Sequence, residues 1–309
     1  MPDEPSKRDR ERQYPMQPPN ISIHLGAHCT DEDRLIKSLL KNQQVLFDHG
    51  VVVPGANRYR PLLREVLGKL NGGAPSEDTQ DVLLAAILDT EGAERLVLSN
   101  ENFLSNHPNA FKKGMLYRNA GVNSAALRKL FPDCAVSFFI SVRNPATFIP
   151  ALHHIVQPGP FDEYVAGIDP DALVWSDVIL DIREHNPDAP ITVWCNEDTP
   201  MIWPEVMQEI TDIDAGVALK GSFDILGQIM ADEGIKRLRG YLASHPPATE
   251  IQRRRVLAAF LDKYALDDEV EEELDLPGWP PDLIDQLTAN YDDDMIEIAR
   301  IPGVTVLTA

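Results

Sequence analysis

The segment GAHCTDED, residues 26–33, carries side chains that can exchange protons or bind ions. An imidazole and a thiol are adjacent in it, at His28 and Cys29, and both are zinc ligands in other proteins. Two further residues stand out along the chain. Glu101 has the carboxylate of a general base, and Arg143 has the planar fork that binds phosphate or carboxylate through two hydrogen bonds.

A metal site is one interpretation of the histidines and the cysteine in and before this segment. Strand alternation, however, does not bring His24 and Cys29 together, and no second ligand pair of suitable spacing appears, so we expect no metal. A nucleophilic Cys29 is a second interpretation. Its acidic neighbours raise the pKa of a thiol, which favours a plain buried or half-buried cysteine instead.

The elements around the segment must position these side chains. In ISIHLG, residues 21–26, alternation places Ile21, Ile23 and Leu25 on one face of a strand. Thr30 and Asp33 have the spacing of a capping box, which predicts a helix that continues to Gly50.

The rest of the chain alternates between short apolar runs and helical patterns. Strands are predicted at 96–99, 136–142 and 191–195, and helices at 60–70, 78–88, 123–130, 146–156, 172–184 and 202–210. Such alternation is typical of an α/β fold with a parallel β-sheet flanked by helices on both faces. We expect a disordered arm at 1–20, an α/β core at 21–215 and an acidic, helical C-terminal extension, 216–309, packed on that core.

The net charge of −21 limits the classes of partner. So acidic a chain repels nucleic-acid phosphate and anionic lipid, so we expect neither nucleic acid nor membrane as a partner. Three cysteines argue for a reducing compartment, and the N-terminus lacks the apolar region of a signal peptide, so we expect a cytoplasmic protein. Acidic residues concentrate at 262–297, a segment that contains 14 of them and a single lysine. Lys112, Lys113 and Arg118 form the densest basic patch outside the N-terminal arm, which we interpret as balancing acidic surroundings.

Five segments, taken in order, resemble one known family. They are GAHCTDED at 26–33, HGVVVPG at 49–55, LVLSNENF at 96–103, SFFISVRNPATFIPALHH at 137–154 and VWCNEDTPMIWPEVMQEI at 193–210. Together they resemble the sulfotransferase family, whose members transfer a sulfuryl group from the nucleotide PAPS. The resemblance spans residues 21–210 and implies a P-loop-type sheet, PAPS or its product PAP as cofactor, and a small-molecule or carbohydrate acceptor.

The resemblance also implies roles for individual residues. The loop that holds the 5′-phosphosulfate corresponds to Gly26, Ala27, His28, Cys29 and Thr30. Arg143 matches the arginine that binds the 3′-phosphate, and Glu101 matches a catalytic glutamate. Each has a structural interpretation too, Glu101 as a hydrogen-bond acceptor and Arg143 as a salt-bridge partner. Glu197 and Asp198 match a further conserved segment of the family.

The chain departs from the family pattern where the anion binds. The lysine position is Cys29, the next glycine is Asp31, and the two hydroxyl positions are Glu32 and Asp33; Ala151 stands for a phosphate-binding serine. Two like charges about 4 Å apart repel by roughly 4 kcal/mol at an effective dielectric of 20, so we expect the altered loop to weaken phosphosulfate binding. The alternative function is a sulfotransferase-fold protein that has lost catalysis and serves as a binding or interaction module.

Overall fold

The computed structural model describes residues 18–88, 92–266 and 275–309. Most of the predicted N-terminal arm and of the acidic run DDEVEEELD therefore lies outside the described residues. Asn20, which was assigned to the arm, is the first residue of the first strand. The boundary expected at residue 215 stays a prediction.

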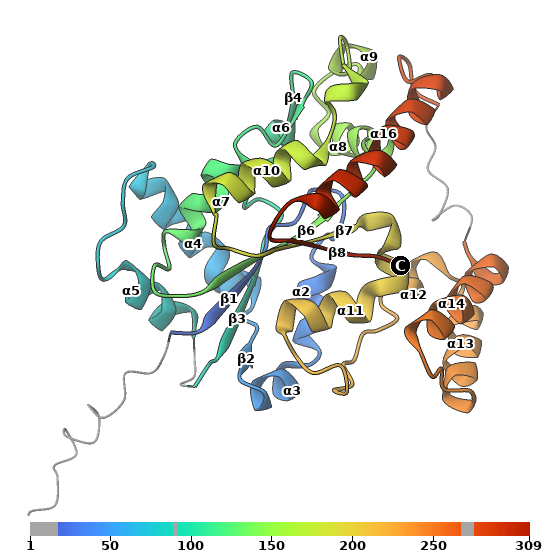
Figure 1. The fold of residues 1–309 in the computed structure, drawn as a ribbon, viewed down its shortest axis with the longest axis horizontal. Helices are drawn as coiled ribbons and strands as arrows, with labels where there is room; N and C mark the ends of the chain where they lie inside the picture. The colour runs from blue at the N-terminus through green and yellow to red at the C-terminus, as the bar shows by residue number, and fades with distance from the viewer. Residues whose placement is uncertain (1–17, 89–91, 267–274) are drawn as a thin grey trace, which may run out of the picture.

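A six-stranded sheet forms the centre of the molecule (Figure 1). Its strands are β1 Asn20–His24, β2 Val51–Val52, β3 Arg95–Ser99, β6 Val136–Val142, β7 Ile191–Cys195 and β8 Val304–Leu307. Their order across the sheet is β2-β3-β1-β6-β7-β8, and every pair is parallel. The α/β fold with a parallel sheet is thus confirmed.

Helices cover both faces of this sheet, and the central strands β1, β3, β6 and β7 are buried on both sides along most of their length. Ile21, Ile23 and Leu25 lie together on one face, as predicted, against one large core. That core is covered by α4 Ala56–Leu70, α5 Thr79–Ile87, α7 Ala120–Arg128, α8 Pro145–Val156, α10 Trp175–His185 and α16 Pro281–Arg300. The opposite face packs Val97 and Trp194 against α2 Arg34–Leu40, α3 Gln43–Asp48 and α11 Thr199–Thr211.

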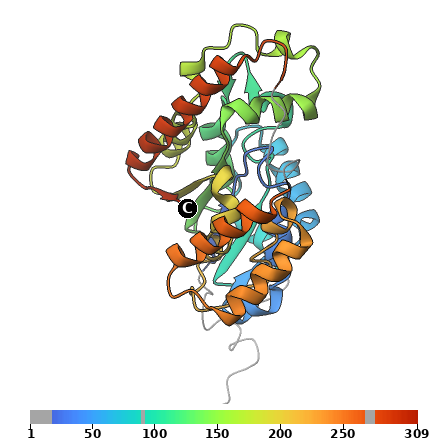
Figure 2. The ribbon, with the colours of Figure 1, turned by 90° about the vertical axis from the view of Figure 1, so that its right-hand side faces the viewer.

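Shorter elements lie around the central sheet and its covering helices. α6 His107–Ala110 leads into a two-stranded hairpin, β4 Phe111–Lys112 and β5 Met115–Leu116, and α9 is Phe161–Tyr164. After α11 come α12 Leu226–Ile229, α13 Asp232–Ser244 and α14 Glu250–Tyr264, which share a small core of their own. In Figure 2 the helices α13 and α14 lie side by side at one end of the molecule.

The helix after the 26–33 loop and the C-terminal end of the chain differ from the sequence prediction. The helix expected to run to Gly50 is two helices, α2 and α3, because the Asn42 side chain donates to Ser38 O and Lys220 O and turns the chain. The residues after 215 are mainly helical, but they end in β8, a strand that the sequence pattern did not indicate. Within the described residues no helix has the length and apolarity to span a membrane.

Candidate functional site

The polar residues that the sequence singles out meet at one edge of the sheet. The chain turns from β1 to β2 and β3 on one side, and later to β6 on the other, so the topological switch point lies at β1. Ligands of open parallel sheets bind beyond the carboxyl ends of the strands at such a point. The segments that leave β1, β3 and β6 there begin at Leu25, Asn100 and Arg143. The parallel topology thus places the 26–33 loop, Glu101 and Arg143 at one edge.

The 26–33 loop packs tightly against the segment that follows β3. Its first part, from Gly26 to Cys29, is buried. Gly26 has φ +59°, and a Cβ built on it would lie 3.0 Å from Glu101 Cα. Only glycine meets both conditions at low cost, so the loop and the Glu101 backbone form one packed unit.

The start of α2 does not use the predicted capping box. The Thr30 hydroxyl donates to Ala27 O at 2.6 Å, and the N-cap residue Asp33 has left-handed φ +65° with no side-chain cap. Asp31 supplies a carboxylate instead, because its Oδ1 accepts from Leu35 N–H at 2.8 Å. The capping prediction was therefore wrong in its residues, and a loop carboxylate occupies a backbone donor of the first turn.

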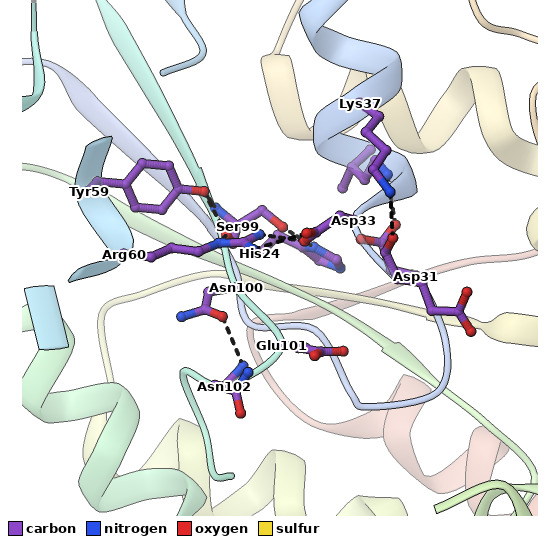
Figure 3. Close-up of polar contacts among 12 residues, drawn as sticks. His24, Asp31, Asp33, Lys37, Tyr59, Arg60, Ser99, Asn100, Glu101 and Asn102 are labelled. Atoms are coloured by element: carbon purple, nitrogen blue, oxygen red, sulfur yellow. Dashed lines mark hydrogen bonds and ion pairs between the residues drawn. The ribbon is translucent and has the colours of Figure 1, made fainter. Parts of the chain in front are cut away.

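Asp33 and Arg60 form the central ion pair of the site. Arg60 Nη2 lies 2.6 Å from Asp33 Oδ1, and Nη1 lies 3.1 Å from Oδ2. Figure 3 shows the two side chains pointing toward each other at the end of β3. Arg60 Nε donates to Ser99 O at 2.8 Å, and the Tyr59 hydroxyl donates to the same oxygen at 2.6 Å. The guanidinium holds the pKa of Asp33 below its usual range.

Two of the three loop carboxylates, those of Glu32 and Asp33, are paired with arginines. Arg34 Nη2 pairs with Glu32 Oε2 at 2.9 Å, and Lys37 Nζ donates to Glu32 O at 3.2 Å. Burial raises the pKa of Asp31 to about 6. The repulsion expected from the sequence counted the loop alone, whereas the structure pairs Arg34 and Arg60 with loop carboxylates and brings Lys37 to the Glu32 carbonyl.

His28 is buried in a fixed orientation. The Tyr117 hydroxyl accepts from His28 N–H at 2.8 Å and lies 2.7 Å from His28 Nδ1. With the hydroxyl donating to Nδ1, we assign the ring proton to Nε2, which faces Asn102 Oδ1 at 3.5 Å. Burial, followed by the nearby His107, lowers the pKa of His28 to about 4. The imidazole is neutral at pH 7.

His24 lies at the end of β1, on the α2 face of the sheet. Its Nδ1 is 2.9 Å from Ser99 Oγ, and its ring stacks on Trp194 with centroids 5.7 Å apart. Burial, followed by the charge of Arg60, lowers its pKa to about 4. In the described part of the chain, no three His, Cys, Asp or Glu side chains cluster as metal ligands do.

Glu101 is half-buried beside a second histidine. His107 Nε2 lies 3.5 Å from Glu101 Oε1, and the His107 ring packs on His28 with centroids 4.2 Å apart. Burial raises the pKa of Glu101, and the nearby His107 opposes that effect. A carboxylate with a raised pKa and a partial opening to solvent is suited to accept a proton.

Arg143 ties the loop to the end of β6. Its Nη1 donates to Cys29 O at 2.6 Å and its Nε donates to Thr147 Oγ1 at 3.0 Å. The next residue, Asn144, donates from its N–H to Glu197 Oε1 at 2.9 Å, and Tyr291 OH lies 3.0 Å from Glu197 Oε2. Arg143 and Glu197 therefore hold the strand ends together in this structure.

Three residues of the site escaped the sequence analysis. Arg60, His107 and Tyr117 come from α4, from α6 and from the turn after β5. Arg60 lies in the helical stripe RYRPLLR and differs in no visible way from a solvated arginine. Its position near the start of α4, the helix that follows β2, is the signal that could have found it.

The comparisons with known proteins are sparse. No protein-family model matches the chain, and no curated protein matches it. It is similar to a solved crystal structure of retinol dehydratase in complex with androsterone and inactive cofactor PAP. The two share 13% sequence identity and a TM-score of 0.32, over 90% of this chain and 82% of that one.

Proposed function

We propose that this chain is a sulfotransferase-like protein that transfers a sulfuryl group from PAPS to a small-molecule or carbohydrate acceptor. One observation carries the proposal. The segments that resemble the family in sequence, the 26–33 loop and those of Glu101 and Arg143, converge at the switch point of a parallel sheet. Nucleotide anions bind at that place in open α/β sheets.

The residues at the loop fit a nucleotide anion in charge. Arg34 and Arg60 pair with loop carboxylates, and Lys37 donates to the Glu32 carbonyl, so an incoming phosphate meets cations as well as acids. Arg60 would supply the positive charge that the family places at the position of Cys29. Arg143 would hold the second phosphate through its guanidinium. For Arg60 to bind a phosphate, its ion pair with Asp33 must open in part.

Glu101 is the proton acceptor in the proposed reaction. When bound, PAPS supplies the sulfuryl group. The Glu101 carboxylate takes the proton from the acceptor hydroxyl, and its raised pKa brings it closer to that task at neutral pH. His107, 3.5 Å away, orients the carboxylate. His28 positions His107 through the ring contact between them.

The first experiment measures thermal stabilisation by PAP. We expect a shift with the wild-type chain that Arg143→Ala abolishes. Arg183→Ala is the matched control, because Arg183 also donates to a backbone carbonyl, Ala189 O at 3.1 Å. We expect it to keep the PAP-dependent shift. Absence of any shift at millimolar PAP in the wild type and in Asp33→Asn would remove the proposal.

A second candidate function, a binding module without catalysis, has its own supporting observation. Asp33 already occupies Arg60, and Asp31 already occupies Leu35 N–H. The loop thus binds its own carboxylates where the family binds an external anion. PAP binding by Asp33→Asn combined with none by the wild type would favour this function over transfer.

A further inference from the structure

A polar pocket opens beside the candidate site. It has a volume of about 640 Å³ and lies between the segment after β3, the β4–β5 hairpin and the start of α7. That volume is within the usual range for pockets that bind small molecules. Asn102 lines the pocket and also accepts from His28 Nε2, so the pocket adjoins the Glu101 region.

Three cations line this pocket without an acidic partner. Within the described residues, Lys112, Lys113 and Arg118 make no salt bridge, although the chain carries a net charge of −21. Lys112 Nζ has one long contact, 3.4 Å to Asn109 Oδ1. The interpretation of these residues as balancing nearby acids is therefore not supported by their contacts. Their charges are available to an external anion.

The hairpin holds these cations in a defined place. Lys113 and Gly114 have φ +55° and +72°, the pattern of a tight type I′ turn between β4 and β5. Phe111 is buried and packs edge-on against Tyr164 with ring centroids 5.2 Å apart, while Lys112 is exposed. Since the apolar side of the hairpin is anchored, the two lysines project from a rigid support.

Amide side chains supply the rest of the polar lining. They belong to Asn102, Asn106, Asn109, Asn119 and Asn123. Each amide offers both donors and an acceptor, which suits the hydroxyls of a sugar. Two are held by their neighbours: Asn109 Nδ2 donates to Asn106 Oδ1 at 2.7 Å, and Asn123 Nδ2 donates to Leu104 O at 2.7 Å.

We propose that this pocket binds a phosphorylated saccharide. A phosphate carries close to two negative charges above pH 7 and accepts several hydrogen bonds, which matches one arginine fork and two lysines. The asparagines then pair with sugar hydroxyls. Phe103, the one ring among the lining residues, is buried, so single-stranded nucleic acid finds no stacking surface here. That this ligand is the acceptor rests on the proposed function; that it binds does not.

The test is calorimetric titration with trehalose 6-phosphate, and with trehalose as the neutral match, at pH 7.5. We expect binding of the phosphorylated sugar at least tenfold tighter than that of trehalose. Lys112→Gln and Arg118→Gln should each weaken it by about threefold, and the double variant by about tenfold. Lys236→Gln, at an exposed lysine of α13, should leave it unchanged.

Several outcomes would overturn the proposal. They are equal affinity for the two sugars, equal effects of the pocket and control substitutions, inorganic phosphate binding as tightly as the phosphorylated sugar, and tighter binding of a uridine oligonucleotide. Failure here is distinct from failure of the proposed function. Binding of trehalose 6-phosphate without binding of PAP would support the pocket proposal and contradict the transfer reaction. Binding of PAP without binding of trehalose 6-phosphate would support the transfer reaction and contradict the pocket proposal.

Discussion

Arg60 reaches from α4 to Asp33 at the start of α2 and binds both of its carboxylate oxygens, at 2.6 and 3.1 Å. The pair spans 27 positions of sequence and joins two helices that lie on opposite faces of the sheet. The ion pair therefore connects the helical layers on the two faces of the sheet, and it is also the main charge contact of the candidate site.

Replacing the acid of this pair should strengthen anion binding. Asp33→Asn keeps a residue type that tolerates left-handed φ and frees the Arg60 guanidinium. Because the pair is partly exposed, we expect PAP affinity to rise by about fivefold, measured by calorimetry at 50 mM salt. Asp48→Asn, at an exposed carboxylate of α3, is the matched control. Equal affinity in Asp33→Asn and the wild type would contradict a role for Arg60 in anion binding.

The dependence of stability on pH should reveal Asp31. The folded chain keeps the Asp31 proton up to about pH 6, whereas the unfolded chain loses it near 3.8, so this group makes stability fall as pH rises between these values. His24 and His28 act in the opposite sense, because their pKa values drop from 6.5 to about 4 on folding.

Asp31→Asn removes the first contribution and leaves the second. We expect the rise of unfolding free energy with pH at 5.5 to steepen by about 1 kcal/mol per pH unit relative to the wild type. Urea denaturation at pH 5.0 and 6.0 measures it, and ionisable groups common to both chains cancel in the difference. Parallel pH profiles would show that Asp31 titrates normally.

The hydroxyl of Tyr117 should contribute to stability through His28. Tyr117→Phe leaves the buried N–H and Nδ1 of His28 without their partner, so we expect a loss of about 1–3 kcal/mol in unfolding free energy. Tyr164→Phe is the control, because in the described chain the Tyr164 hydroxyl makes no hydrogen bond, and we expect a change below about 0.5 kcal/mol. Similar losses in both variants would exclude the proposed hydrogen-bond effect.

The contact between Gly26 and Glu101 can be separated from backbone strain. Gly26→Ala and Gly72→Ala both force alanine into positive φ, which costs about 1–2 kcal/mol. Only the first also brings a Cβ to 3.0 Å from the Glu101 backbone; around Gly72 nothing lies within 4 Å. We expect Gly26→Ala to lose at least about 1 kcal/mol more in urea denaturation. Equal losses of unfolding free energy in the two variants would mean that the loop moves away from the added Cβ without a cost in stability.

Glu101 should affect turnover and not affinity if the proposed function holds. Glu101→Gln keeps the shape of the side chain and removes its capacity to accept a proton. With water as the acceptor, we expect the release of PAP from PAPS to slow by at least about 100-fold, while the affinity for PAP stays unchanged. Chromatography measures the release. Glu65→Gln, at an exposed α4 carboxylate, should change neither quantity. Unchanged release in Glu101→Gln would assign the residue a structural role.

Four of the six strands could be predicted because local patterns determine them. Short apolar runs such as 136–142 and 191–195 are unmistakable strands, and parallel pairing follows from the helices between them. Once the strands are parallel, Glu101 and Arg143 must lie at one edge, since each follows the end of a strand. This placement needed no knowledge of side-chain contacts.

The charge balance of the loop could not be predicted, because it depends on contacts between distant residues. A helical pattern shows which face of α4 is buried, but not that Arg60 lies level with the end of β3. The alternation in VTVL is too short to indicate β8, which is stabilised by pairing with β7. The pattern at Thr30 and Asp33 was equally ambiguous, because a hydroxyl can bond back to its own loop as readily as cap a helix.

Arg143 holds the loop at the Cys29 carbonyl and Arg60 holds it at the Asp33 side chain. Only residues 30–32 lie between these two contacts. A sequence change within this tripeptide meets a backbone that is already held at both ends. Selectivity for a ligand can thus drift, or be redesigned by saturation mutagenesis, while the scaffold that carries it is left in place. Glu32, whose side chain is exposed, is accordingly the first position to vary, because Thr30 and Asp31 bond to the backbone at Ala27 O and Leu35 N–H.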